Sequence, residues 1–254
     1  MRLRAGAAVV AATVLACGTV AVAQSTQVNQ YDVTGDVTPN KVGTKAKPLP
    51  VGLKVGWTMS AANGARPATV ERYTINVYGG RENTELFPSC PAVEINNALS
   101  DDGCPKASKF GSGFLEAKIG QTSNPSDMSI QCRIPVVLYN GGKRRASIYL
   151  ETAPPACPVP INQAIDARFV DAFGGKGRGL RFSVPDNLMH PIPGLSVAVT
   201  HVETTLPRKT TRVKGRLRGF LESTEPCVKG ERYLEVEFVT EGGDKQSDRF
   251  TKAC

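Results

Sequence analysis

The chain has 254 residues, of which 41% are hydrophobic and 21% charged, and its formal net charge is +8. It is long enough for one large or two ordinary domains with a real core. Two histidines and one tryptophan leave it poor in general bases and in rings that stack on sugars. The basic excess favours anionic partners in general.

The N-terminus has the pattern of a secretory signal. Arg2 and Arg4 precede an uncharged run over residues 5–22, and Ala21-Val22-Ala23 is a small-x-small cleavage motif. We therefore predict a signal peptide over residues 1–23 and export. An alternative is a lipoprotein acylated at Cys17, but the apolar run continues five residues beyond it. No later stretch approaches the roughly 18 apolar residues of a membrane span, so we expect no transmembrane segment.

Residues 24–50 follow as an extended arm, with one strand near residues 31–37. Beyond the arm, apolar residues alternate with polar ones or glycine, which is typical of strands with one buried face. The runs that show this period are Val51 to Met59, Tyr73 to Val77, Ile134 to Leu138, Leu195 to Val199 and Leu234 to Phe238.

Turn residues separate these runs, and the chain holds 25 glycines and 18 prolines. The turn pairs are Asn63-Gly64, Gly79-Gly80, Gly141-Gly142, Gly174-Gly175 and Gly242-Gly243. One helix is expected over residues 91–99. Many short strands between such turns predict an all-β fold.

A weak internal repeat sets the expected domain organisation. Gly113-Phe114-Leu115-Glu116 recurs 106 residues later as Gly219-Phe220-Leu221-Glu222. A proline-rich connection over residues 152–160 lies between the two copies. We therefore expect two consecutive immunoglobulin-like β-sandwich units, over residues 51–158 and 159–254. One pseudo-symmetric sandwich is the alternative.

Six cysteines remain after the predicted leader, and four of them frame two similar hairpins. Each hairpin has a Gly-Gly turn and a cysteine near each end, 25 and 27 positions apart. This repeat predicts the bonds Cys132–Cys157 and Cys227–Cys254, and by remainder Cys90–Cys104 around the helix. Three structural disulfides indicate an oxidising compartment. No C-x-x-C motif supports a zinc site or redox catalysis, and we expect neither a metal nor a cofactor.

Catalytic motifs are not evident. A serine or cysteine hydrolase would need His190, in a proline-rich loop, or His201, a strand-end or partly buried residue, as its base. A glycosidase would need two carboxylates. Glu116 and Glu222 are the tempting pair, but strand alternation places each opposite its preceding leucine, so we interpret both as surface residues. Asp101-Asp102 and Asp166 with Asp171 do not follow the calcium-loop pattern.

A basic stripe is the most distinctive polar feature. Every second residue from 212 to 218 is cationic, and on one strand these side chains would share a face about 7 Å apart. The candidate binding residues are Arg212, Lys214, Arg216 and Arg218. Such a face suits an anionic polymer, whereas nucleic acid is disfavoured because no aromatic platform accompanies the cations. The alternative is a solvated strand whose cations discourage edge pairing.

Several segments resemble a loose group of secreted β-rich proteins of unknown function from high-GC Gram-positive bacteria. They are Phe87-Pro88-Ser89-Cys90, the run from Cys104-Pro105 to Gly113, and the closing hairpin from Cys227 to Cys254. The resemblance implies export and a disulfide-stapled β fold, and it supplies no activity.

We therefore expect a non-catalytic secreted or envelope-associated protein that binds an anionic envelope polymer through the basic stripe. The alternative, from another functional class, is a secreted carbohydrate-active enzyme that uses paired carboxylates. A third interpretation is a lipid-anchored or lipid-carrying envelope protein, which requires Cys17 as an anchor or an apolar cavity between the sheets.

Overall fold

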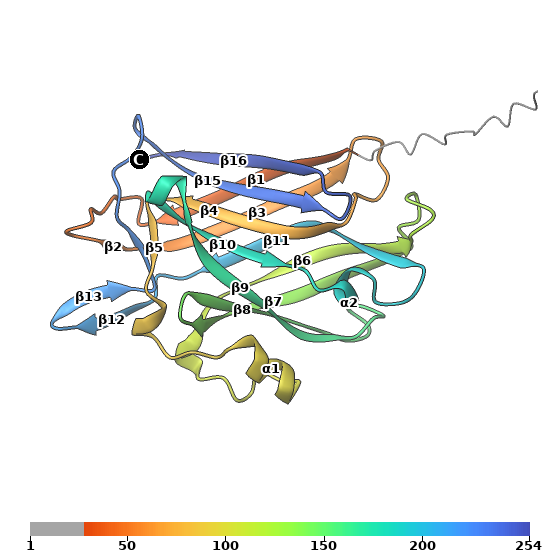
Figure 1. Ribbon diagram of the computed structural model, residues 1–254, viewed down its shortest axis with the longest axis horizontal. Coiled ribbons are helices and arrows are strands. Elements are labelled where there is room, and N and C mark those ends of the chain that lie inside the picture. Colours follow the sequence, from red (N-terminus) through yellow and green to blue (C-terminus); the bar gives the residue numbers. More distant parts are fainter. Residues whose placement is uncertain (1–27) are drawn as a thin grey trace, which may run out of the picture.

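The computed structural model describes residues 28–254 and shows a fold built almost entirely of antiparallel strands (Figure 1). The predicted signal peptide and Cys17 lie outside the described residues. The strands are β1 (Asn29–Thr38), β2 (Leu49–Pro50), β3 (Gly52–Ala61), β4 (Val70–Tyr78), β5 (Gly80–Glu82), β6 (Lys109–Gln121), β7 (Ile130–Gly142), β8 (Arg145–Thr152), β9 (Ile161–Ala172), β10 (Gly177–Ser183), β11 (Leu195–Leu206), β12 (Thr210–Val213), β13 (Arg216–Gly219), β14 (Leu221–Ser223), β15 (Glu231–Thr240) and β16 (Lys245–Ala253). The helical segments are α1 (Ala92–Ala98), α2 (Asp186–Met189) and short 3-10 turns at Thr84–Leu86, Lys106–Ser108 and Phe173–Gly175. The prediction of an all-β fold is confirmed.

Eleven strands form one sheet in the order β1-β3-β11-β6-β7-β8-β9-β10-β4-β15-β16. The sheet curls until its two edge strands come together. The backbone N–H of Val33 in β1 donates to Asp248 Oδ2 in β16 at 2.7 Å, and Lys252 in β16 forms an ion pair with Asp36 in β1. These contacts cover the two edges, which would otherwise offer unpaired backbone groups to other chains.

The two halves of the chain share this sheet rather than forming consecutive immunoglobulin-like units. Strand β4, from the first half, lies between β10 and β15 of the second, and β3 pairs with β11. Across the expected boundary at residue 158, β8 pairs with β9 along its whole length. The division expected from the repeat is therefore not a division of the sheet.

The N-terminal arm is part of the same sheet. Its predicted strand is β1, which pairs with β3 from Asn29 to Thr38. Two small sheets complete the fold: β2-β14-β5, and the two-stranded β12-β13, which projects from one end of the molecule (Figure 1).

Alternation along the strands places apolar side chains inside the curled sheet. In β15, Leu234, Val236 and Phe238 are buried, and the residues between them are more exposed. One group of buried apolar residues comes mainly from β6 to β9, and a second comes from β1, β3, β4, β11 and β15. These two groups face each other across the interior.

All three predicted disulfides are present: Cys90–Cys104, Cys132–Cys157 and Cys227–Cys254. The last two close the β7–β8 and β15–β16 hairpins, as the spacing indicated. The helix predicted over residues 91–99 is α1, which ends where Leu99 adopts a left-handed conformation.

Helix α1 lies outside the main interior and packs on β8 and β9. The Asn96 side chain exchanges two hydrogen bonds with the backbone of Ala164, at 2.9 and 2.7 Å. Cys90 and Ile95 bury their side chains against Tyr139 and Tyr149. Within the described residues, no helix has the length and apolar character needed to cross a membrane.

Candidate ligand-binding cavity

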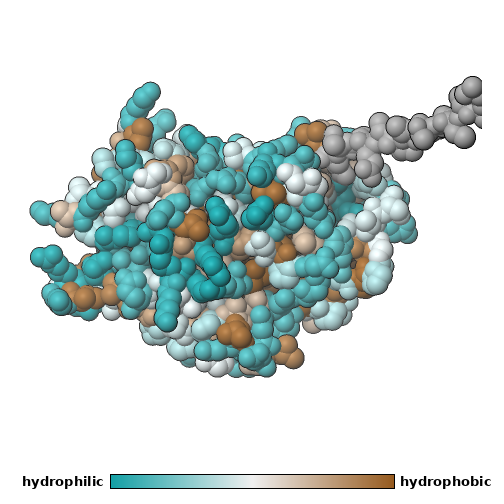
Figure 2. Space-filling view, viewed as in Figure 1, coloured by the Kyte–Doolittle hydropathy of each residue, from teal (hydrophilic) through white to brown (hydrophobic). Residues whose placement is uncertain are grey.

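The interior of the curled sheet contains an apolar cavity of about 500 Å³. This volume lies in the range of about 300–1,000 Å³ that is usual for small-molecule sites. Its apolar lining includes Ile75, Val77, Leu115, Ile134, Val136, Leu138, Ile148, Leu150, Ile165, Leu180, Phe182, Val197, Val199, Val202, Leu206 and Leu221. In contrast, the molecular face in Figure 2 is mostly hydrophilic, with apolar residues only in small scattered groups.

The partial exposure of these inward side chains comes from the cavity. In β10, Leu180 and Phe182 alternate with Arg181 and Ser183, which are exposed outside. Leu180 and Phe182 are only half-buried although they face the interior, and both line the cavity. The sheet thus encloses more space than its side chains fill, unlike the dense packing usual in protein cores.

One end of the cavity, which we call the basic end, carries four cationic side chains together with the carboxylates of Asp36 and Glu222. The cationic side chains in its lining are Arg81, Arg178, Arg232 and Lys252. Three of them have carboxylate partners: Arg81 contacts Glu222, Arg178 contacts Glu82, and Lys252 contacts Asp36.

Glu222 is the centre of the polar contacts at this end and corrects the expectation of a surface glutamate. Its side chain is completely buried. Its carboxylate accepts hydrogen bonds from Arg81 at 2.5 Å, from Arg218 at 2.9 and 3.3 Å, and from the N–H of Gly219 at 3.0 Å. Burial raises the pKa of Glu222, but bonds from Arg218, Arg81, Asn83 and Gly219 outweigh it and lower the pKa to about 2.

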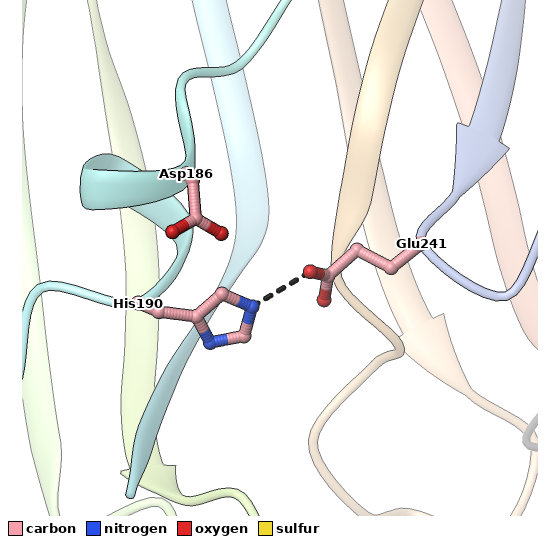
Figure 3. A group of neighbouring side chains, drawn as sticks. All are labelled: Asp186, His190 and Glu241. Carbon is pink, nitrogen blue, oxygen red and sulfur yellow. Dashed lines mark hydrogen bonds and ion pairs between the residues drawn. The ribbon is translucent and has the colours of Figure 1, made fainter. Parts of the chain in front are cut away.

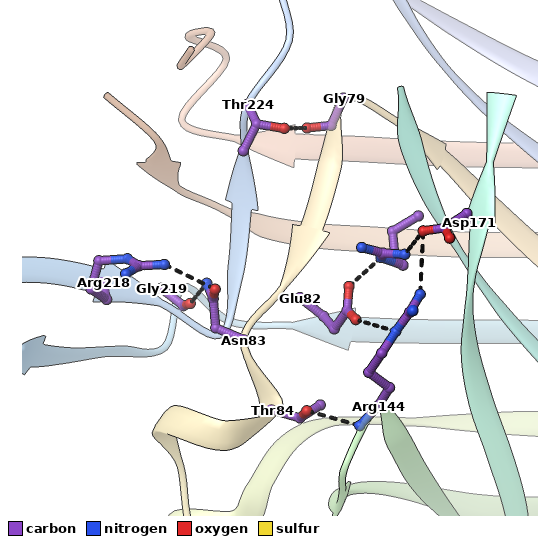
Figure 4. A network of polar contacts seen from close by, with 10 residues as sticks. Gly79, Glu82, Asn83, Thr84, Arg144, Asp171, Arg218, Gly219 and Thr224 are labelled. Atoms are coloured by element: carbon purple, nitrogen blue, oxygen red, sulfur yellow. Dashed lines mark hydrogen bonds and ion pairs between the residues drawn. The ribbon is translucent and has the colours of Figure 1, made fainter. Parts of the chain in front are cut away.

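A second buried carboxylate, Glu82, ties β5 to the main sheet (Figure 4). Arg144 contacts it at 3.2 Å, Arg178 pairs with its other oxygen, and both arginines also contact Asp171. In the β14–β5 pair, Glu82 lies opposite Leu221 and Arg81 lies opposite Glu222, so the two glutamates project from opposite faces. The two buried glutamates therefore do not form a glycosidase-like pair.

Glu116 is a surface residue, as expected. It accepts a hydrogen bond from Arg133 at 2.7 Å, and the Arg133 guanidinium lies 3.5 Å from the centre of the Phe114 ring. In the second copy of the Gly-Phe-Leu-Glu motif, Phe220 is buried and stacks on Phe110. The two copies of the Gly-Phe-Leu-Glu motif therefore lie in different environments. The sequence repeat does not correspond to structurally equivalent positions.

The other end of the cavity is covered by the loop that contains α2. Leu188 and Pro191 of this segment line the cavity. Beside them, His190, Asp186 and Glu241 bring their ligand-type atoms within 4.8 Å of one another (Figure 3). His190 Nε2 lies 2.6 Å from Glu241 Oε1, and this hydrogen bond raises the pKa of His190. From the sequence we interpreted His190 as a loop residue. Glu241 lies in the β15–β16 turn, which is distant from His190 along the chain.

The remaining candidate residues contact other side chains of the protein. His201 is half-buried beside the Phe114 ring. Asp101 accepts a hydrogen bond from Tyr139 Oη at 2.5 Å, and Asp166 pairs with Arg145. These acidic side chains are thus engaged by protein donors.

The basic stripe is not a single strand face, which corrects the expected geometry. Lys214 and Gly215 both have positive φ angles, of 48° and 76°, and form the turn between β12 and β13. In this hairpin Arg212 lies opposite Leu217 and Val213 lies opposite Arg216, so Arg212 and Arg216 project from opposite faces. Arg218 is held by Glu222 and by Asn83 Oδ1 at 2.9 Å.

Three of the four predicted binding residues remain exposed at the end of this hairpin. We call Arg212, Lys214 and Arg216 the hairpin-tip cations. Polymer binding through them stays a prediction, with Arg218 assigned instead to the support of Glu222.

No family model and no curated protein matches this chain. Among solved structures, one similar chain is AvmM, described as catalysing macrocyclization in alchivemycin A biosynthesis. It has 10% identity, a TM-score of 0.22, and coverage of 87% of this chain and 89% of that chain. Another is Scytalido-glutamic peptidase with a peptide-based transition state analog, at 11% identity, TM-score 0.16, and coverage of 86% and 87%. At these scores neither carries an argument about fold or function.

Proposed function

We propose that this chain is an exported, non-catalytic binding protein that holds an apolar small molecule inside its curled sheet. The apolar cavity of about 500 Å³ carries the proposal. It is the feature that the lipid-carrying interpretation of the sequence required. The three disulfides support the proposed export, because such bonds are typical of oxidising compartments.

The rival proposal, a carbohydrate-active enzyme, has less support from the same surroundings. Of the two glutamates considered from the sequence, Glu222 is enclosed by arginines and Glu116 is paired with Arg133. Asp186 and Glu241 do approach each other, but Glu241 is bonded to His190. The described residues show no evident catalytic motif.

Binding of a neutral apolar reporter tests the proposal. We expect N-phenyl-1-naphthylamine to gain fluorescence on addition of the protein, and 1-hexadecanol to displace it. Leu180→Trp should abolish this binding, because the larger ring occupies the cavity. Arg181→Trp, which adds the same ring to the exposed face of β10, should leave it unchanged. Absence of a fluorescence gain with the folded wild-type protein would overturn the proposal.

We also propose that the hairpin-tip cations bind an anionic envelope polymer. The β12–β13 hairpin projects from the molecule (Figure 1), and its three cations are exposed. This surface lies apart from the apolar cavity lining, so the two proposals are tested separately.

A further inference from the structure

Arg232 occupies a position that the pattern of β15 reserves for apolar residues. It shares its inward face with Leu234, Val236 and Phe238, and it is only 8% exposed. Its side chain lines the basic end of the cavity. An arginine at this position is therefore surrounded by the lining of the cavity rather than by solvent.

The guanidinium of Arg232 has donors without acceptors. Among the described residues, neither Nε nor Nη2 of Arg232 finds a hydrogen-bond partner, and both atoms are buried. Its neighbour across the β15–β16 pair, Lys252, is satisfied by Asp36. Arg81 and Arg178 form ion pairs with Glu222 and Glu82. Of the four cations in the cavity lining, Arg232 is thus the one without a carboxylate.

An unpaired charge in such surroundings is unfavourable. Burial lowers the pKa of Arg232, yet an arginine side chain stays protonated in proteins. Removing the guanidinium from water without a nearby anion costs free energy, and no neighbouring carboxylate offsets this cost. An anionic ligand in the cavity would supply the missing charge.

The two unpaired donors, Nε and Nη2 of Arg232, indicate the shape of the ligand head group. Nε–H and one N–H of Nη2 point in parallel along one edge of the planar guanidinium. This edge matches the two oxygens of a carboxylate, which can accept both bonds at once. Most of the cavity lining beyond this end is apolar, which suits a hydrocarbon chain.

We infer that the cavity binds a long-chain carboxylate, with its head on the Nε and Nη2 donors of Arg232 and its alkyl chain along the apolar lining. The inference rests on the proposed function and names its ligand class. The carboxylate neutralises the buried arginine, and the chain fills the space between the two groups of apolar residues.

The test compares two probes that differ only in the head group, hexadecanoate and 1-hexadecanol. Both are titrated against the protein with bound N-phenyl-1-naphthylamine at pH 7.5, where the acid is ionised. We expect hexadecanoate to displace the reporter at a concentration about tenfold lower or more, as a difference of about 1.4 kcal/mol in affinity implies.

Two variants locate the preference. Arg232→Met should remove it and leave hexadecanol binding unchanged, whereas Arg232→Lys should keep part of it, because a lysine supplies charge without the parallel donors. The matched control is Arg249→Met, which removes an arginine from the next strand, where it contacts Glu235 and the Tyr233 ring. This control should behave as the wild type.

The outcomes separate the inference from the proposed function. Equal affinity of the wild type for both probes would overturn the carboxylate inference while leaving the apolar site intact. Binding of neither probe would overturn the proposed function itself. If Arg232→Met does not fold, the wild-type preference and its reduction in Arg232→Lys still decide the question.

Discussion

Replacing Glu222 by glutamine should change how the stability of the protein depends on pH. The Glu222 carboxylate is completely buried between Arg81 and Arg218. Lowering its pKa from an ordinary value of 4.5 to about 2 corresponds to about 3 kcal/mol, because one pKa unit is about 1.4 kcal/mol. This is a large share of the stability of an ordinary domain, which is about 5–15 kcal/mol.

The direction of the pH effect follows from where the proton binds. In the unfolded chain Glu222 takes up a proton near pH 4.5, whereas in the folded protein it stays ionised down to about pH 2. Its contribution is therefore complete above pH 4.5 and is lost as the pH falls towards 2. In Glu222→Gln this contribution is absent at every pH.

Urea unfolding of the wild type and Glu222→Gln, at intervals from pH 7 to pH 2, measures the effect. We expect the difference in unfolding free energy between the two proteins to fall by about 3 kcal/mol over this range. Other carboxylates with lowered pKa values, such as Asp36 and Asp127, are present in both proteins, so their contributions cancel.

Glu116→Gln is the matched control, because it removes a carboxylate from the exposed pair with Arg133. Its effect should stay within about 1 kcal/mol at every pH. A constant difference between wild type and Glu222→Gln from pH 7 to pH 2 would refute the assignment of Glu222 as a buried, arginine-stabilised carboxylate.

Four further predictions concern other parts of the molecule. Glu241→Gln should lower the His190 pKa in an NMR titration, and an unchanged pKa would contradict the pairing of the two residues. In the wild type this pairing stabilises the fold below pH 6.5, and the stabilisation is lost as the pH rises through the raised pKa of His190. Replacing Cys132 and Cys157 by serine should cost about 3 kcal/mol in urea unfolding; a loss below about 1 kcal/mol would show that this closure matters little. Without added ligand, Arg232→Met should raise the unfolding free energy by about 1–4 kcal/mol, because an unpaired buried charge disappears, and a lower stability would indicate that the arginine has a protein partner. Neutral replacement of the hairpin-tip cations should abolish salt-sensitive retention on isolated cell envelopes while leaving the unfolding free energy within about 0.5 kcal/mol; unchanged retention would exclude them as the contact.

The local features of this fold were readable in the sequence because they depend on neighbours along the chain. Period-2 alternation located β3, β4, β7, β11 and β15. The spacing of cysteines around Gly-Gly turns located the two stapled hairpins, since a hairpin brings its own ends together. Helix α1 was likewise expected near its observed bounds.

The errors arose at one overlooked turn and where distant segments meet. The basic stripe was assigned to one strand, although Gly215 inside it was a signal for the turn that the structure shows. Glu222 was assigned to the surface because alternation distinguishes two faces without showing whether both are covered. Arg232 was overlooked, although it precedes Leu234 by two residues on the same face.

The sequence by itself determined that the chain forms stapled antiparallel strands, because alternation, turns and cysteine spacing act over short separations. Only the tertiary structure decided that strands of both halves interleave in one curled sheet, since pairing between distant strands depends on the packing of all the inward faces together. That closure creates the apolar cavity and withdraws Glu222 and Arg232 from water. The burial of Glu222 and the unpaired charge of Arg232 arise only when the whole sheet is assembled, because no single strand can enclose a side chain.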